Sequence, residues 1–225
     1  SWAGTFRGRA SREKPPTDAA ANVFKVAIEV TTEGSKSLPK PVLQNTQEPS
    51  PFENDSFTYV TKLPWFAVKD SGFSDVQKLT MSPVYTLERK DRYQLIYHND
   101  NGTDAPQTPV IQYSEGFSQS RTDSFSETVG VKFGSKWKVG ESFEASIELS
   151  YSFTEGYATT AGIVTSTTRT FPLNTPAWTA VAVYTVQSTF RLFRTDGALV
   201  GEALTADKPK SVYYTQYRSA KAAGK

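Results

Sequence analysis

The sequence predicts an all-β protein, and three observations support that prediction. Aromatic residues make up 13% of the chain, with 11 Tyr and 14 Phe, and they are mixed with runs of Ser and Thr. Such side chains favour strands, while the scattered Gly and Pro favour turns between them. No stretch as long as an ordinary helix shows convincing helical spacing of apolar residues. The 225 residues are enough for one elongated β domain or two small ones.

The composition excludes several classes of function. The formal net charge is +2, from 25 basic and 23 acidic side chains, which leaves no positive excess for binding nucleic acid. The absence of cysteine excludes a disulfide framework and a thiolate metal site, and the single histidine excludes a multi-histidine metal site. No apolar run is long enough for a transmembrane helix. We therefore expect no catalytic residues, no metal and no cofactor.

The chain divides into three regions. Residues 1–22 are predicted to be a basic flexible arm or the remnant of a processing site, residues 23–116 an amino-terminal β region that binds a receptor or forms a cap, and residues 117–225 a second β region. The predicted strands are residues 23–32, 57–63, 84–88, 93–98, 178–194, 198–200 and 211–217, and residues 117–169 are predicted to be a β meander. Turn chemistry at 99–102 and at Asp196 and Gly197 separates neighbouring strands.

Residues 129–153 are predicted to form an amphipathic hairpin whose register follows from its own pattern. A three-residue turn at Val139, Gly140 and Glu141 places Val131 opposite Leu149 and keeps apolar side chains on one face. A two-residue turn would set each apolar side chain against a polar one, because side chains alternate between faces with a period of two. Each arm also has the length of a tilted transmembrane strand.

The two faces of this hairpin suit lipid and water. The face expected to meet lipid consists of Val129, Val131, Phe133, Trp137, Phe143, Ala145, Ile147, Leu149, Tyr151 and Phe153, interrupted by one serine. The charged residues expected to line a pore lumen are Lys132, Lys136, Lys138, Glu144 and Glu148. Membrane β-barrels show this alternation, and a lone hairpin would leave edge backbone groups unpaired in lipid. Insertion would therefore require a closed ring of subunits.

The same pattern also fits a half-buried hairpin of an ordinary β-sandwich, with its apolar face on the core and its charged face in water. The flanking segments favour the membrane interpretation. Ser and Thr occupy six successive even positions from Ser118 to Thr128, and residues 154–170 are similarly rich in Ser and Thr. Such strands stay soluble before insertion and tolerate a change of pairing.

The order of these segments resembles the aerolysin-like β-pore-forming toxins. The resemblance rests on a Ser/Thr-rich strand, an amphipathic hairpin ending in LSYSF, a second Ser/Thr-rich strand and a Pro-marked turn into a β-branched strand, and it covers residues 117–194. The pattern is similar to epsilon-toxin and mosquitocidal-toxin relatives and to monalysin-like insecticidal proteins. This resemblance implies an elongated architecture of long twisted strands, proteolytic activation, a homo-oligomeric ring and cytolysis through a β-barrel.

The resemblance also implies where the protein acts and with what. We expect a secreted protein that moves to the target-cell membrane, where it oligomerises. Its partners would be that membrane, other copies of the chain and an unknown receptor, which is a glycan, a lipid or a protein. No nucleic acid is expected.

Two other classes of function agree with parts of the sequence. Asp91, Asp100 and Asp104 could form a glycosidase pair or bind a cation, although acidic residues near Gly and Asn usually form turns. His98 is predicted to be a surface residue at the end of a strand. A sugar-binding β-sandwich module without membrane insertion is the alternative to a pore. Its stacking surfaces would be Trp65, Phe66 and Tyr97.

Overall fold

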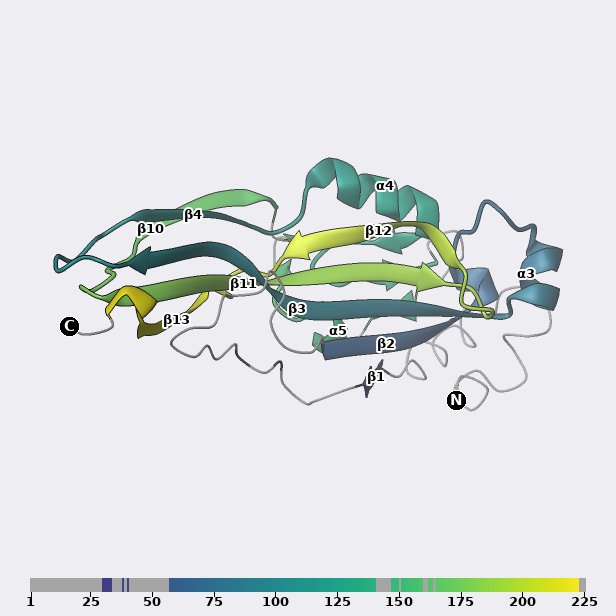
Figure 1. Cartoon of the computed structure of the whole chain (residues 1–225). Coiled ribbons are helices and arrows are strands. Elements are labelled where there is room, and N and C mark those ends of the chain that lie inside the picture. Colours follow the sequence, from purple (N-terminus) through teal and green to yellow (C-terminus); the bar gives the residue numbers. More distant parts are fainter. Residues whose placement is uncertain are drawn as a thin grey trace.

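A long antiparallel sheet forms the axis of the elongated molecule (Figure 1). The computed structural model describes residues 30–33, 38, 40, 57–140, 147–149, 151–159, 162–163 and 165–222. Most of the described chain is in strands, which confirms the all-β prediction. Residues 1–22, and most of the predicted strand at 23–32, lie outside the described residues.

The main sheet has the strand order β1, β2, β3, β11, β12, and β13 pairs with β11 as well. Its strands are β1 (Val30–Glu33), β2 (Phe57–Pro64), β3 (Val84–Asn101), β11 (Thr179–Phe193), β12 (Leu199–Asp207) and β13 (Tyr213–Arg218). All pairs are antiparallel. The strands predicted at 57–63, 178–194 and 211–217 are therefore confirmed. Because β3 and β11 are the longest strands and pair with each other, they join the two ends of the molecule.

The turn predicted at Asp196 and Gly197 connects β11 to β12. Arg194 N donates to the Ala198 carbonyl at 2.8 Å, and Gly197 N donates to the Arg194 carbonyl at 2.9 Å. Gly197 has a φ of 89°, which glycine adopts without a steric penalty. The strand after the turn continues to Asp207, well beyond the predicted residues 198–200.

One uninterrupted strand, β3, replaces the two strands predicted at 84–88 and 93–98. Charged residues lie between the two predicted strands. The structure instead buries Arg89 and Asp91 on one face of β3, where they form an ion pair. Mutual neutralisation removes much of the cost of burying each charge, so the strand continues through them.

Smaller elements cover the two faces of the main sheet. They are η1 (Trp65–Ala67), α3 (Asp75–Met81), β4 (Val110–Glu115), α4 (Gln119–Val129), β5 (Val131–Lys132), β6 (Lys138–Val139), β7 (Ile147–Glu148), α5 (Tyr151–Thr154), β8 (Ala158–Thr159), β9 (Gly162–Ile163), β10 (Thr167–Pro172) and η2 (Ala220–Ala222). The pair β4 and β10 packs Ile111 against Val181 and Val183 of β11. At the other end of the molecule, α4 lies along β12 (Figure 1).

The residues upstream of the hairpin were predicted to form a strand, but they form the helix α4. Its buried residues, Thr122, Phe125 and Val129, have helical spacing and face the core. The alternating Ser and Thr residues hide this spacing in the sequence. Gly130, with a φ of 84°, ends the helix and donates its N–H to the Ser126 carbonyl at 2.9 Å.

Candidate membrane-insertion segment

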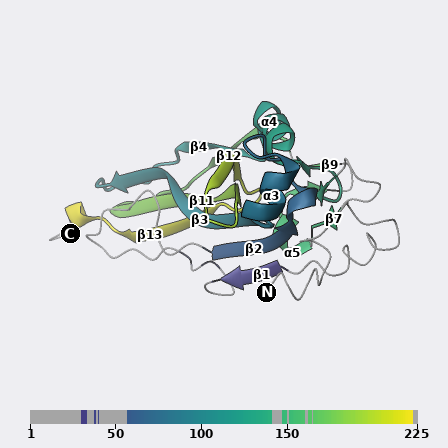
Figure 2. The ribbon, with the colours of Figure 1, turned by 90° about the vertical axis from the view of Figure 1, so that its right-hand side faces the viewer.

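Residues 129–153 are hereafter the insertion segment, and those of them that the structure describes lie against one face of the main sheet. Figure 2 shows β7, β9 and α5 together on that side. The described strands of the segment form a separate three-stranded sheet in the order β5, β6, β7. They pair with one another and not with the main sheet, so side-chain burial contributes most of the attachment.

The predicted register is absent from this conformation. Val131 is opposite Val139, and Val139 is opposite Ile147, whereas the sequence predicted Val131 opposite Leu149. Val139 belongs to β6 rather than to a turn, Gly140 follows it with a φ of 92°, and Glu141 lies outside the described residues. The three short strands bury Val131, Val139 and Ile147 in the core.

The separation of apolar and polar faces is nevertheless present. The buried side chains of the segment, each at most 5% exposed, are Val129, Val131, Trp137, Val139, Ile147, Leu149 and Phe153. Phe133 is partly buried against the same core. Phe143 and Ala145 lie outside the described residues, as does the side chain of Tyr151. The apolar residues assigned to lipid thus face the protein core wherever the structure describes them.

The polar face of the segment meets solvent. Lys132, Lys136 and Lys138 are exposed, and Glu148 is partly exposed. Lys136 Nζ lies 3.5 Å from Glu148 Oε1, in an ion pair on the surface. Glu144 lies outside the described residues. Their assignment to a pore lumen stays a prediction.

Trp137 is the largest fully buried side chain of the segment. Its ring centroid lies 4.7 Å from that of Phe133, 5.4 Å from Phe190 on β11 and 5.7 Å from Phe117. Its indole Nε1 has no hydrogen-bond partner among the described residues. An unsatisfied buried donor costs about 1–3 kcal/mol, which offsets part of the stabilisation that the packing of Trp137 provides.

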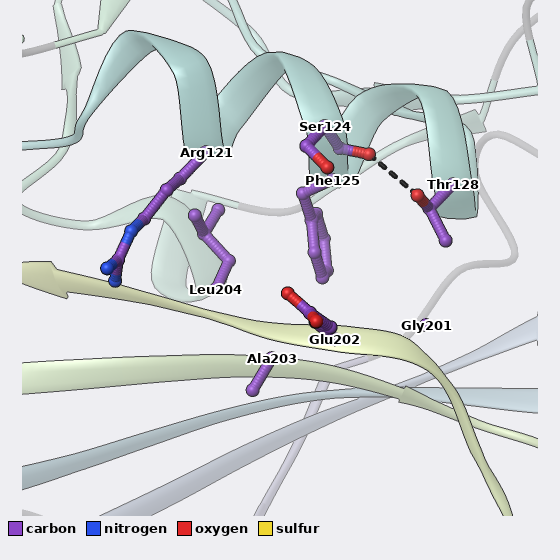
Figure 3. Close-up of a pocket in the computed structure, with 8 residues that line it drawn as sticks. All are labelled: Arg121, Ser124, Phe125, Thr128, Gly201, Glu202, Ala203 and Leu204. Atoms are coloured by element: carbon purple, nitrogen blue, oxygen red, sulfur yellow. Dashed lines mark hydrogen bonds between the residues drawn. The ribbon is translucent and has the colours of Figure 1, made fainter.

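A groove separates much of α4 from β12 (Figure 3). Its volume is about 470 Å³, and Arg121 and Glu202 line it from opposite sides. Phe125 reaches from the helix toward the strand, as Figure 3 shows. Thr128 bonds to the Ser124 carbonyl at 2.8 Å, a local bond that competes weakly with helix geometry.

The structure separates Asp91 from Asp100. Asp91 is buried and paired with Arg89, while Asp100 lies nine residues further along the same extended strand. At the usual rise per residue that spacing separates them by about 30 Å. Asp104 is exposed beyond the end of β3. Asp91 and Asp100 are therefore too far apart to act together as a pair of catalytic carboxylates.

The aromatic residues proposed as a sugar platform are not on an open surface. Trp65 and Phe66 are 7% and 5% exposed and belong to the largest hydrophobic cluster, and Tyr97 packs partly buried against the cluster of Ile111, Val181 and Val183. The prediction for His98 also needs correction. Its ring is partly buried and stacks on Tyr217, with Nε2 2.7 Å from the tyrosine hydroxyl.

The described residues define the class of protein as an elongated all-β protein. The structure is similar to the crystal structure of Cry35Ab1, with a TM-score of 0.57 and 12% sequence identity. The similarity covers 81% of this chain and 54% of that chain, so this chain spans about half the length of the protein it matches. At this identity the likeness is one of fold alone.

No family model and no curated protein sequence matches the chain. Within the described residues, no helix is both long and apolar enough to span a bilayer.

Proposed function

We propose that this protein is a secreted pore-forming toxin that oligomerises on a target-cell membrane and inserts residues 129–153 of each subunit as a β-hairpin. The observation that supports this proposal most directly is the attachment of the insertion segment. Its apolar face is buried against the sheet, while its described strands pair only with one another. The segment can therefore leave without breaking a strand pair of the main sheet.

The exchange of environments favours such a movement. A buried Leu or Val side chain gains roughly 1.5–3 kcal/mol by leaving water, and lipid provides an apolar environment comparable to the protein core. Transfer from the core to lipid is therefore close to neutral for Leu149 and Val131. The exposed Lys136 and Glu148 could remain in water if they face a lumen.

Helix α4 supports a larger rearrangement at the beginning of the segment. Ser, Thr and Asp, which are poor helix formers, occupy much of it. Ser or Thr recurs at each of its even positions, a period of two that would place these side chains on one face of a strand, although Phe125 and Val129 hold the segment as a helix here. In the proposed pore, α4 becomes extended and lengthens the first arm of the hairpin.

Oligomerisation must precede insertion in this proposal. An unpaired backbone N–H or C=O in hydrocarbon costs several kcal/mol as an order of magnitude, and only closure with neighbouring copies pairs the two edges of each hairpin. The partners are thus other copies of the chain, the target membrane and a receptor that is a glycan, a lipid or a protein. The fold shared with Cry35Ab1 agrees with this function.

Dye release from liposomes tests the proposal. The protein, after limited proteolysis, is added to vesicles that contain a self-quenching dye, and the same vesicles are imaged by negative stain. Release of dye together with ring-shaped particles supports the proposal. Binding to vesicles or cells without release would instead identify a binding module. Complete absence of release and rings after activation, on membranes of susceptible cells as well, contradicts pore formation.

A further inference from the structure

Arg89 is the most completely buried cation in the described part of the chain. Its side chain is 1% exposed, and it forms a two-point ion pair with Asp91, with Nε to Oδ1 at 2.9 Å and Nη2 to Oδ2 at 3.0 Å. Ser188 Oγ donates to the same carboxylate at 2.5 Å. The guanidinium also lies over the rings of Tyr59, Tyr157 and Phe190. These contacts fix the guanidinium on the face of the sheet that the insertion segment covers.

The remaining amino group of Arg89 binds the chain at the end of the insertion segment. Nη1 donates to the carbonyl of Phe153 at 2.9 Å and to that of Glu155 at 2.8 Å. Phe153 lies in α5, and Glu155 follows that helix directly. Carbonyls at the end of a helix lack partners within the helix, so Arg89 supplies the partners that they need.

A second connection joins the same stretch of chain to the sheet. The Tyr157 hydroxyl donates to Ser188 Oγ at 2.7 Å, and Ser188 in turn donates to Asp91. Tyr157 is fully buried. The network therefore starts at the carbonyls of Phe153 and Glu155, passes through Arg89, Asp91 and Ser188, and returns to the chain at Tyr157.

We propose that Arg89 holds the carboxyl-terminal end of the insertion segment on the sheet and so acts as a latch against its release. This inference rests on the proposed function. Departure of residues 153–157 would leave two N–H donors of a buried cation without acceptors, which is costly where water is excluded. At the other end of the segment, the Val129 carbonyl accepts a single neutral bond from Lys69 N at 3.0 Å. The two ends are therefore held unequally.

The chemistry of the latch requires arginine. Four of its five N–H groups are used, in a planar fork toward Asp91 and in a separate direction toward the carbonyls. Lysine has a compact ammonium group on a flexible stem. In Arg89→Lys the charge opposite Asp91 is preserved, but one ammonium cannot reproduce both sets of contacts.

Hydrogen exchange of the Arg89→Lys variant in solution tests the latch. We expect the amides of residues 151–159 to exchange roughly ten- to a hundredfold faster than in the wild type, the factor that the loss of hydrogen bonds to a charged group predicts. Amides of β3 and β11 should change much less. The matched control is Arg194→Lys, which breaks another two-point pair, with Asp70, away from this stretch. It should leave residues 151–159 near the wild-type rate.

Two results would overturn the latch. One is unchanged exchange at residues 151–159 in Arg89→Lys. The other is an equal increase in the exchange rates of residues 151–159, β3 and β11. Arg89 would then stabilise the whole fold and not this end of the segment in particular. Vesicle leakage of the wild type is measured in parallel. If the wild type fails to leak, the proposed function fails, while the exchange result still decides whether Arg89 holds this end of the segment.

Discussion

Gly140 lies directly against Ala67. A Cβ atom added to Gly140 would lie 3.6 Å from the Cβ of Ala67 and 3.4 Å from its Cα. Gly140 is the centre of the turn predicted for the inserted hairpin, and Ala67 belongs to η1, next to β2. The part of the segment that would cross the bilayer first is therefore in contact with the stationary part of the protein.

A reversible disulfide between these positions should block pore formation. The separation of 3.6 Å is within the range of Cβ atoms in disulfides, and the chain has no other cysteine to interfere. We expect oxidised Ala67→Cys/Gly140→Cys protein to bind membranes without releasing dye, and reduction on the membrane to restore release. Fluorescence dequenching before and after addition of reductant measures both states.

Gly140 has a φ of 92°, so its replacement alone strains the backbone by about 1–3 kcal/mol. The single variant Gly140→Cys, treated with the same oxidant, controls for that strain. Leakage by the oxidised double variant, with the disulfide confirmed by mass spectrometry, would show that this part of the segment does not need to move.

Leu149→Asp is expected to destabilise the soluble protein. An aspartate on a face that meets only lipid would leave the soluble protein folded. Because Leu149 and Ile147 are 4% and 5% exposed, a carboxylate at either position is desolvated before any membrane is present. We expect a loss of roughly 3–5 kcal/mol in the free energy of unfolding, measured with urea. A loss below 1 kcal/mol would contradict the burial described here.

Glu148→Lys should change ion selectivity at little cost to folding. Its carboxylate is partly exposed and pairs with Lys136 on the surface, an interaction of at most about 1 kcal/mol. If Glu148 lines the lumen, each subunit of the ring adds positive charge, and the reversal potential shifts toward anions. Glu202→Lys makes the same charge change on β12, outside the segment, and should leave the reversal potential unchanged.

Asp70 should make the protein sensitive to acid. Hydrogen bonds from Arg194, at 2.7 and 2.8 Å, and one from the Tyr85 hydroxyl, at 2.7 Å, lower the pKa of Asp70 below its ordinary 3.8. Because the pKa of Asp70 is lower in the folded state than in the unfolded state, its carboxylate stabilises the fold at pH values above the unfolded-state pKa. This stabilisation is lost as the pH falls through the folded-state pKa. Asp70→Asn should cost about 2 kcal/mol at neutral pH, measured by urea unfolding, and much less at a pH below the folded-state pKa of Asp70.

Asp207 provides a comparison of opposite sign. Burial raises the pKa of its carboxyl group, against a lowering by the hydrogen bond from Gln94 at 2.8 Å. Because the pKa of Asp207 is higher in the folded state, its charged carboxylate destabilises the fold at neutral pH. This destabilisation is lost as the pH falls through the folded-state pKa toward the unfolded-state pKa. Asp207→Asn should therefore raise the melting temperature at neutral pH and lose that advantage in acid. Equal pH profiles for the two variants would contradict both assignments.

The elements predicted correctly from the sequence are those that depend on residues close together in the chain. The alternation and β-branching of residues 178–194 identify β11, and Asp196 with Gly197 identifies its turn, since side-chain period and turn chemistry depend on a few neighbouring residues. The two faces of the insertion segment were predicted for the same reason. The amphipathic pattern specifies which side chains need an apolar environment.

The features that were missed depend on residues far apart in the chain. The pattern around Val131 and Ile147 does not reveal whether sheet or lipid covers them, and the soluble conformation uses a different pairing from the predicted one. The unbroken β3 requires the pairing of Arg89 with Asp91 on one buried face. An Arg and an Asp two residues apart, between Leu87 and Tyr93 on the same face, are the signal that could have revealed it.

The pairing of β3 with β11 has a consequence for how the chain folds. These strands lie far apart in the sequence, and everything from β4 to β10, including the insertion segment, is the loop that their pairing closes. Long-range pairing of this kind is slow, because loop-closure entropy is lost before the contacts form. The surface on which the segment rests does not exist until that ladder is complete, so the segment docks late. Its release at a membrane would then retrace the last step of folding and leave the earlier ones intact.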